Sequence, residues 1–203
     1  MARIPYYTWM ILTDIFSHCS KYTRRVLFVN IELRVFISLA SDFVLLISGS
    51  TCDKGIDLGI IVDRSRSVGK ENYIKLKDAL KTFLDNFNIS EETTHTSLIF
   101  FAGEATHLFN LSDSQYHSNA AAKARIDSLS DKLYYGTRTD LALMKAHDHL
   151  FENGHDRRKR PNVLVVFTDG QTAAESAPYS ETVPPLEVSR PSVGLPVASN
   201  TTE

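Results

Sequence analysis

At 203 residues the chain is long enough to form one domain of ordinary size with additional segments. Hydrophobic residues make up 43% and charged residues 23%, which excludes a chain that is disordered throughout or that fills a membrane. The formal net charge of -2 gives no reason to expect a nucleic acid as partner. The two cysteines, Cys19 and Cys52, are too few for a disulfide scaffold.

Residues 1–50 form a leader that the sequence describes only in outline. An apolar stretch over 26–47 follows several basic residues and ends in Ser48-Gly49-Ser50, which is the order of a secretory signal. A membrane anchor is the first alternative. The three charges at Glu32, Arg34 and Asp42 oppose it, because each costs roughly 2.5–3.5 kcal/mol at mid-bilayer. A leader unrelated to targeting is the second alternative.

Residues 51–172 alternate between strand and helix patterns. The expected strands span 57–62, 96–102, 105–109 and 163–167, and the expected helices span 70–87, 117–133 and 141–151. Apolar strands that alternate with helices predict an α/β fold with a doubly wound, mostly parallel sheet. The tail over 173–203 holds five of the seven prolines and has no apolar period, so we expect it to be disordered.

Polar side chains follow the apolar strands at the points where a parallel sheet places its ligands. Asp63, Ser65 and Ser67 come after the strand over 57–62, and Asp169 comes after the strand over 163–167. A further polar turn holds Thr137 and Thr139. Carboxylates and hydroxyls without a nearby histidine or thiol form a hard oxygen site that suits Mg²⁺ or Mn²⁺. The alternative is that the two serines merely cap the helix that follows.

These segments together resemble the von Willebrand factor type A (VWA) domain, in its matrilin-like, extracellular matrix form. The matching segments are Asp-Leu-Gly-Ile-Ile-Val-Asp63-Arg-Ser65-Arg-Ser67, Gly136-Thr137-Arg-Thr139 and Val-Leu-Val-Val-Phe-Thr-Asp169-Gly. The resemblance implies a metal-ion-dependent adhesion site. In such a site Ser65, Ser67 and Thr137 bind the cation directly, and Asp63 and Asp169 hold it directly or through water. Thr137 is chosen over Thr139 because it is the first threonine of the pair. A Glu or Asp of a partner protein then fills the open position, with Arg64, Arg66, Arg138 and Thr139 at the rim.

The resemblance covers about residues 55–172. The family continues with a helix, two strands and a closing helix, where this chain has its proline-rich tail. We therefore expect a truncated member with strand order 3-2-1-4, the strands being counted from residue 57. The last two strands are missing, and residues 163–167 form an exposed apolar edge, which is an aggregation hazard. Cys52 either pairs with a cysteine of the missing part, pairs with Cys19, or stays unpaired.

The function that these features favour is divalent-cation-dependent binding of an extracellular protein, such as a collagen-like matrix protein, by a secreted module that is not an enzyme. The alternatives are an intracellular VWA scaffold, a non-functional fragment, and Mg²⁺-dependent phosphoryl transfer with Asp63 as nucleophile and Lys70 as the nearby lysine. If the chain is secreted, Asn88, Asn110 and Asn200 are candidate glycosylation acceptors. We expect the basic loop over 157–160 to be solvated and the histidines, which lack metal-ligand spacing, to lie on the surface.

Overall fold

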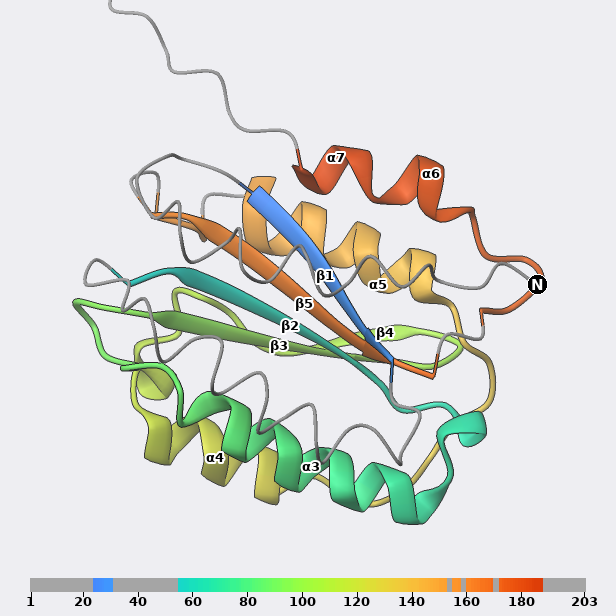
Figure 1. The fold of residues 1–203 in the computed structure, drawn as a ribbon, viewed down its shortest axis with the longest axis horizontal. Helices are drawn as coiled ribbons and strands as arrows, with labels where there is room; N and C mark the ends of the chain where they lie inside the picture. Colours follow the sequence, from blue (N-terminus) through green and yellow to red (C-terminus); the bar gives the residue numbers. More distant parts are fainter. Residues whose placement is uncertain (1–23, 31–54, 153–154, 158–159, 170–171, 188–203) are drawn as a thin grey trace, which may run out of the picture.

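A mixed sheet lies between two layers of helices in the computed structural model, which describes residues 24–30, 55–152, 155–157, 160–169 and 172–187 (Figure 1). Within these residues the sheet has five strands in the order β1-β5-β2-β3-β4. The strands are β1 (Arg24–Asn30), β2 (Asp57–Asp63), β3 (His95–Phe101), β4 (Ala105–Phe109) and β5 (Asn162–Thr168). All neighbours pair in parallel except β3 and β4. The predicted α/β fold and the order of its four core strands are confirmed.

The helices cover both faces of the sheet because the central strands are apolar on both faces. On one face lie α3 (Lys70–Leu84) and α4 (Asn119–Asp127), and on the other lie α5 (Thr139–Ala146), α6 (Tyr179–Thr182) and α7 (Pro184–Glu187) (Figure 1). The described residues also include two short 3₁₀ helices, η1 (Arg66–Val68) and η2 (Ser114–Tyr116), and one π-helical segment, η3 (His147–Glu152).

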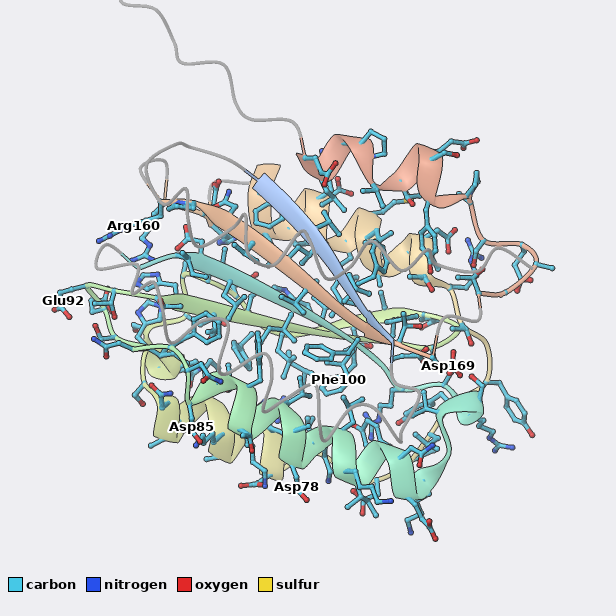
Figure 2. The ribbon with its side chains drawn as sticks, in the orientation of Figure 1. Asp78, Asp85, Glu92, Phe100, Arg160 and Asp169 are labelled. Atoms are coloured by element: carbon cyan, nitrogen blue, oxygen red, sulfur yellow. The ribbon has the colours of Figure 1, made fainter. Side chains whose placement is uncertain are left out.

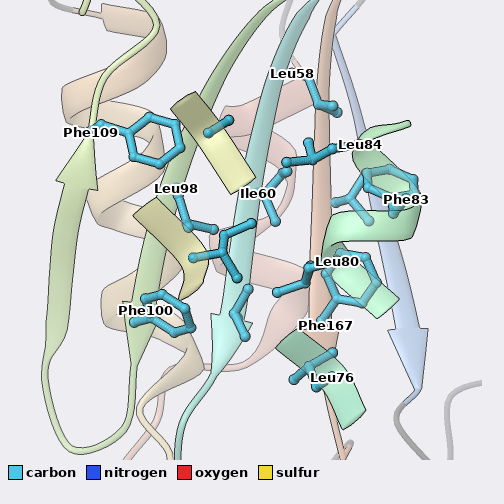
Figure 3. Packing of buried hydrophobic residues seen from close by; sticks show 14 of the residues in the cluster. Leu58, Ile60, Leu76, Leu80, Phe83, Leu84, Leu98, Phe100, Phe109 and Phe167 are labelled. Carbon is cyan, nitrogen blue, oxygen red and sulfur yellow. The ribbon is translucent and has the colours of Figure 1, made fainter. Parts of the chain in front are cut away.

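Alternate residues of β2 pack into two separate hydrophobic cores, one on each face of the sheet. Leu58 and Ile60 pack beneath α3 among residues such as Leu80 (Figure 3). Ile61 belongs to the core on the α5 side. Gly59 also lies on the α5 side. A Cβ there would stand 2.7 Å from Leu164 Cδ1 and 3.0 Å from Leu150 Cδ1, so a larger residue would force these two leucine side chains to move. The two-faced burial holds the carboxyl end of β2 in a fixed position.

The N-terminal segment corrects one prediction. We expected β5 to be an exposed edge, but β1 pairs with it in parallel along its whole length, from Arg24 opposite Asn162 to Asn30 opposite Thr168. Val26 is buried in the core on the α5 side, and the ring of Phe28 contacts that of Tyr179, 4.9 Å between centroids. Part of the expected leader is therefore a strand of the sheet. Local sequence could not show this, because residues 24–30 and 162–168 meet only in the fold.

The tail is a second correction. We expected disorder over 173–203, yet residues 172–187 are ordered on the sheet, and Leu186 of α7 is fully buried with Val26 and Leu164. Prolines stand just before α6 and at the start of α7, where a missing N–H costs nothing. The remaining tail, residues 1–23 and 31–54, Cys19, Cys52 and Asn200 lie outside the described residues.

Three helices also differ from their expected bounds, and the first is the helix predicted over 70–87, which ends at Leu84 as α3. The helix predicted over 117–133 begins at Asn119, where Ser118 Oγ accepts a hydrogen bond from the Ala121 N–H (3.2 Å), and ends at Asp127. The chain then extends toward Tyr134, which forms an isolated bridge with Ser65. The helix predicted from Leu141 begins at Thr139 and gives way to η3 after Ala146.

Candidate metal-ion site

Asp63 is the last residue of β2, and both of its carboxylate oxygens are held in place. The Ser65 backbone N–H donates to Oδ1 (2.8 Å), and the Thr168 hydroxyl at the end of β5 donates to Oδ2 (3.0 Å). The side chain is fully buried. Burial raises the pKa of Asp63 to about 6, the hydrogen bonds from Ser65 lower it, and the charge of Asp169 raises it. A buried carboxylate beside a second carboxylate is a place where a cation is stabilising.

The two serine hydroxyls meet each other and do not cap a helix. Ser65 Oγ and Ser67 Oγ are 2.8 Å apart. Ser65 makes no side-chain cap at η1, and the residue before α3 is Gly69, which has no side chain to offer. The alternative that these serines merely cap the next helix is therefore wrong. Ser65 is buried, while Ser67 is exposed, so the pair spans from the interior to the surface.

The loop that holds Thr137 is fastened against the β2 turn by backbone contacts. The Arg66 N–H donates to the Tyr134 carbonyl (2.9 Å), and the Arg138 N–H donates to the Ala102 carbonyl (2.6 Å). Gly136 has φ +83° and packs directly on Gly103, so close that a Cβ would stand 2.8 Å from Gly103 Cα. Glycine is needed here because it adopts a positive φ without strain and has no Cβ to clash with Gly103. The loop over 134–139 therefore lies beside the turn that carries Ser65.

Thr137 is half-buried, whereas Thr139 is fully buried as the first residue of α5. The Thr137 carbonyl accepts a hydrogen bond from the Ala173 N–H (2.9 Å), which ties this loop to the segment that follows Asp169. Thr137 is the more accessible of the two threonines, and its role as the metal ligand stays a prediction from the sequence.

Asp169 follows β5 directly, and β5 is the parallel neighbour of β2, so Asp169 and Asp63 end at the same edge of the sheet (Figure 2). Asp63, Ser65 and Ser67 share this edge with the loops that hold Thr137 and Asp169. All the donors are hard oxygens, the set that Mg²⁺ and Mn²⁺ prefer. The residues present fit a hydrated divalent cation with a position left for an outside oxygen.

The sequence pattern missed Tyr179, which comes from the tail expected to be disordered. Burial raises the pKa of the Tyr179 hydroxyl, the Thr139 side chain lowers it, and the negative charges of Asp63 and Asp169 raise it, so Tyr179 belongs to the electrostatic surroundings of the site. No periodicity in the tail indicated this position.

The predicted rim is only partly free to meet a partner. Arg64 donates to the Ser130 side chain (2.8 Å) and lies over the rings of Tyr73, Phe100 and Tyr134, so its charge is used within the domain. Arg138 forms a two-pronged ion pair with Asp140, at 2.8 and 2.7 Å. Arg66 is exposed and stacks 3.6 Å over the Tyr135 ring, which is 73% exposed. This pair is the exposed part of the rim.

A family model for the von Willebrand factor type A domain matches residues 57–193, more than half of the chain. The chain belongs to the VWA family. Among curated relatives, chicken (Gallus gallus) matrilin-3 is 30% identical over 123 residues, which cover 59% of this chain and 26% of that protein. Human integrin alpha-E is 30% identical over 117 residues, which cover 57% of this chain and 10% of that protein. The matched part of the chain thus spans about a quarter or less of these relatives.

Solved structures agree with the VWA fold. Proximal thread matrix protein 1 from the mussel byssus, solved with its metal-ion-dependent adhesion site occupied by zinc, is 27% identical with a TM-score of 0.53, covering 62% of this chain and 31% of that chain. Manganese-loaded TRAP protein of Plasmodium vivax is 23% identical with a TM-score of 0.56, covering 60% and 48%. Structural relatives of this VWA domain therefore bind metal.

Proposed function

We propose that this VWA domain binds a divalent cation, Mg²⁺ or Mn²⁺, and uses it to dock an acidic side chain of an extracellular protein. The observation that carries the proposal is the meeting of Ser65 Oγ with Ser67 Oγ (2.8 Å) beside the buried carboxylate of Asp63. Thr137 and Asp169 complete the ligand set from the neighbouring loops. If each of these five side chains supplies one oxygen, at least one of the six positions that Mg²⁺ prefers is left for an outside oxygen.

A Glu or Asp of a partner is the suitable outside ligand because it brings a charged oxygen to the cation. Exposed Arg66 lies near the turn and attracts such a partner, although Arg64 and Arg138 are engaged elsewhere. The matrilin relatives suggest a matrix protein as the partner class, and within it we propose a collagen-like protein. Secretion and glycosylation belong to the same proposal. Asn88 is exposed, whereas Asn110 is half-buried and its side-chain oxygen is buried. Asn88 is therefore the better glycosylation acceptor of the two. Among the described residues no helix has the length and apolarity to cross a membrane.

Phosphoryl transfer by Asp63 is disfavoured as the alternative. A nucleophilic carboxylate needs an accessible oxygen, but both oxygens of Asp63 accept hydrogen bonds and the side chain is fully buried. Lys70, the nearby lysine, is exposed at the start of α3.

The test measures Mn²⁺ binding by titration calorimetry, and then adhesion to a triple-helical collagen-like peptide that carries glutamate. The Ser65→Ala/Ser67→Ala double variant should lose Mn²⁺ binding, because the two hydroxyls supply direct ligands. Ser114→Ala, an exposed serine in η2, is the control and should bind as the wild type does. Circular dichroism checks that each variant is folded. Mn²⁺ binding that survives in the double variant, or peptide binding unchanged in EDTA, would contradict the proposal.

A further inference from the structure

A second group of possible metal ligands lies at the opposite edge of the sheet. His95 opens β3 and pairs with Asp57 at the start of β2, while Asp63 ends β2. Six residues of strand separate the two edges, about 20 Å at the rise of a β-strand. The group consists of Glu91, His95 and His117, with one ligand atom from each lying within 4.8 Å of the others. In the sequence these histidines are 22 positions apart, so spacing did not indicate them.

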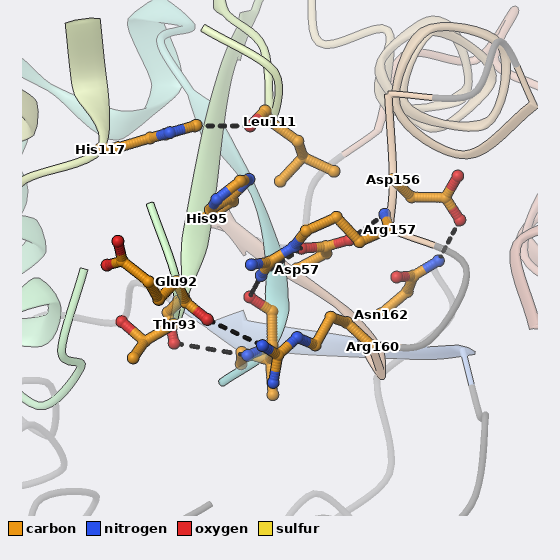
Figure 4. A network of polar contacts seen from close by, with 12 residues as sticks. Asp57, Glu92, Thr93, His95, Leu111, His117, Asp156, Arg157, Arg160 and Asn162 are labelled. Atoms are coloured by element: carbon orange, nitrogen blue, oxygen red, sulfur yellow. Dashed lines mark hydrogen bonds and ion pairs between the residues drawn. The ribbon is translucent and has the colours of Figure 1, made fainter. Parts of the chain in front are cut away.

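The two imidazoles are held by their surroundings rather than free on the surface, which corrects the expectation for these histidines. Their rings stack with centroids 3.7 Å apart. His95 is buried, and the side chain of His117 is 4% exposed. The His117 ring meets the Glu91 carboxylate through Nδ1 (2.5 Å) and the Leu111 carbonyl through Nε2 (2.8 Å), as Figure 4 shows for Leu111. His95 Nε2 meets the Glu91 carbonyl (2.9 Å).

We propose that Glu91, His95 and His117 form a zinc site, with water or a partner's side chain in the fourth position. Two imidazole nitrogens and one carboxylate oxygen are a ligand set that Zn²⁺ takes with an open fourth position. The set differs from the all-oxygen site around Asp63 and is poorly suited to Mg²⁺. The nearby charges of Asp57 and Arg157 offset each other in a close ion pair, which leaves the Glu91 carboxylate as the charge available to a cation.

Binding requires a small, local movement. Ligand atoms around tetrahedral zinc are about 3.3 Å apart, from bond lengths of ~2.0–2.1 Å, so Glu91 and His117 must separate slightly to admit the ion. The Glu91 side chain is 65% exposed and moves without losing packing. The stacked rings, now 24° from parallel, must also splay so that their nitrogens point at one ion. His117 lies between η2 and α4 and can shift, while His95 is fixed on β3.

Such an ion would tie the loop between α3 and β3 to the segment between β4 and α4. Both segments lie outside the site around Asp63, so the zinc would cross-link them without involving that site. The proposal therefore stands or falls independently of cation binding at the other edge.

The experiment uses the full chain with Ser65→Ala/Ser67→Ala as background, which removes zinc binding at the other site. Equilibrium dialysis against Zn²⁺ alone should find one equivalent per chain, and the proton resonances of the two imidazoles should shift as the stacking opens. Glu91→Gln removes a charged direct ligand and should weaken zinc affinity by at least ~10-fold, because the loss of an outer-shell partner alone costs that much. Glu92→Gln is the matched control, because this neighbouring glutamate is also exposed and outside the group.

Cobalt substitution adds a geometric readout, since a four-coordinate Co²⁺ site absorbs visible light far more strongly than a six-coordinate one. A background variant that binds no zinc would overturn the proposal, and so would binding that Glu91→Gln and Glu92→Gln affect equally. Because Glu91 is exposed, its substitution decides the matter even if His117→Gln fails to fold.

Discussion

Replacing Gly136 with alanine should both destabilise the domain and weaken cation binding. Gly136 has φ +83°, where an alanine costs about 1–2 kcal/mol relative to glycine. Its new Cβ would also stand 2.8 Å from Gly103 Cα and 3.1 Å from Gly103 N, both backbone atoms that cannot rotate away. Displacing packed atoms typically costs a further ~1–3 kcal/mol. The total is about 2–5 kcal/mol of unfolding free energy.

The functional consequence follows from where the strain is relieved. If the loop over 134–139 moves outward, Thr137 moves away from Ser65 and Ser67, and the cation loses a ligand. We therefore expect weaker Mn²⁺ binding in the folded variant, measured by calorimetry, together with a lower urea midpoint.

Two other glycines serve as controls. Gly69 has φ +78° but open space around its Cβ position, where the nearest atom is Asn72 Nδ2 at 3.9 Å, so Gly69→Ala measures the backbone cost alone. Gly55→Ala would clash with the Thr93 backbone at the far edge of the sheet, so it should reduce stability and leave the Mn²⁺ affinity of the folded protein unchanged. The reasoning is refuted if Gly136→Ala destabilises no more than Gly69→Ala, or if it leaves Mn²⁺ affinity unchanged.

Three further predictions concern stability. Leu186→Ala should lower the unfolding free energy by ~2–5 kcal/mol, because the side chain is fully buried; no loss in urea melts would mean that the tail does not pack on the sheet. Burial and, second, the charge of neighbouring His149 lower the pKa of His107 to about 4, so its stabilising contribution is present above pH 6.5 and is lost as pH falls toward 4. His107→Gln should flatten that loss between urea melts at pH 7 and 4.5, and an unchanged pH dependence would contradict the assignment. Asp57→Ala should cost ~3–5 kcal/mol, because it strands the Arg157 guanidinium beside Ile56; adding Arg157→Ala should recover part of the loss, and strictly additive losses would exclude the coupling.

The pairing of Asp57 with Arg157 also shows where local sequence misleads. Residues 157–160 read as a solvated basic loop, but Arg157 Nε donates to Asp57 Oδ1 (2.7 Å) and the Arg160 guanidinium donates to the Glu92 carbonyl (2.7 Å), as Figure 4 shows. Arg157 therefore binds the start of β2, and Arg160 binds the segment just before β3. A run of arginines carries no sign of its partners, because those partners lie about 70 or 100 positions away in the chain.

The sequence by itself determined the central strands and the chemistry at their carboxyl ends. An apolar run that ends in Asp63 must be a buried strand with a polar turn, since both faces of the run are apolar and the turn residues are not. The same holds for the run before Asp169, and parallel pairing of β2 with β5 then brings the two carboxylates to one edge. These features are local, so pattern and spacing were enough to predict them.

Only the tertiary structure shows which further segments join the sheet and its helices. The pairing of β1 with β5 and the packing of Leu186 in one core with Val26 join segments well over a hundred residues apart. The meeting of His95 with His117 likewise arises because β3 and the segment before α4 converge at one edge. Residues 24–30 have the same apolar pattern in a leader or in a strand. Only the open edge of β5 gives that pattern its role, because an unpaired strand edge gains hydrogen bonds and apolar burial from whichever segment can reach it.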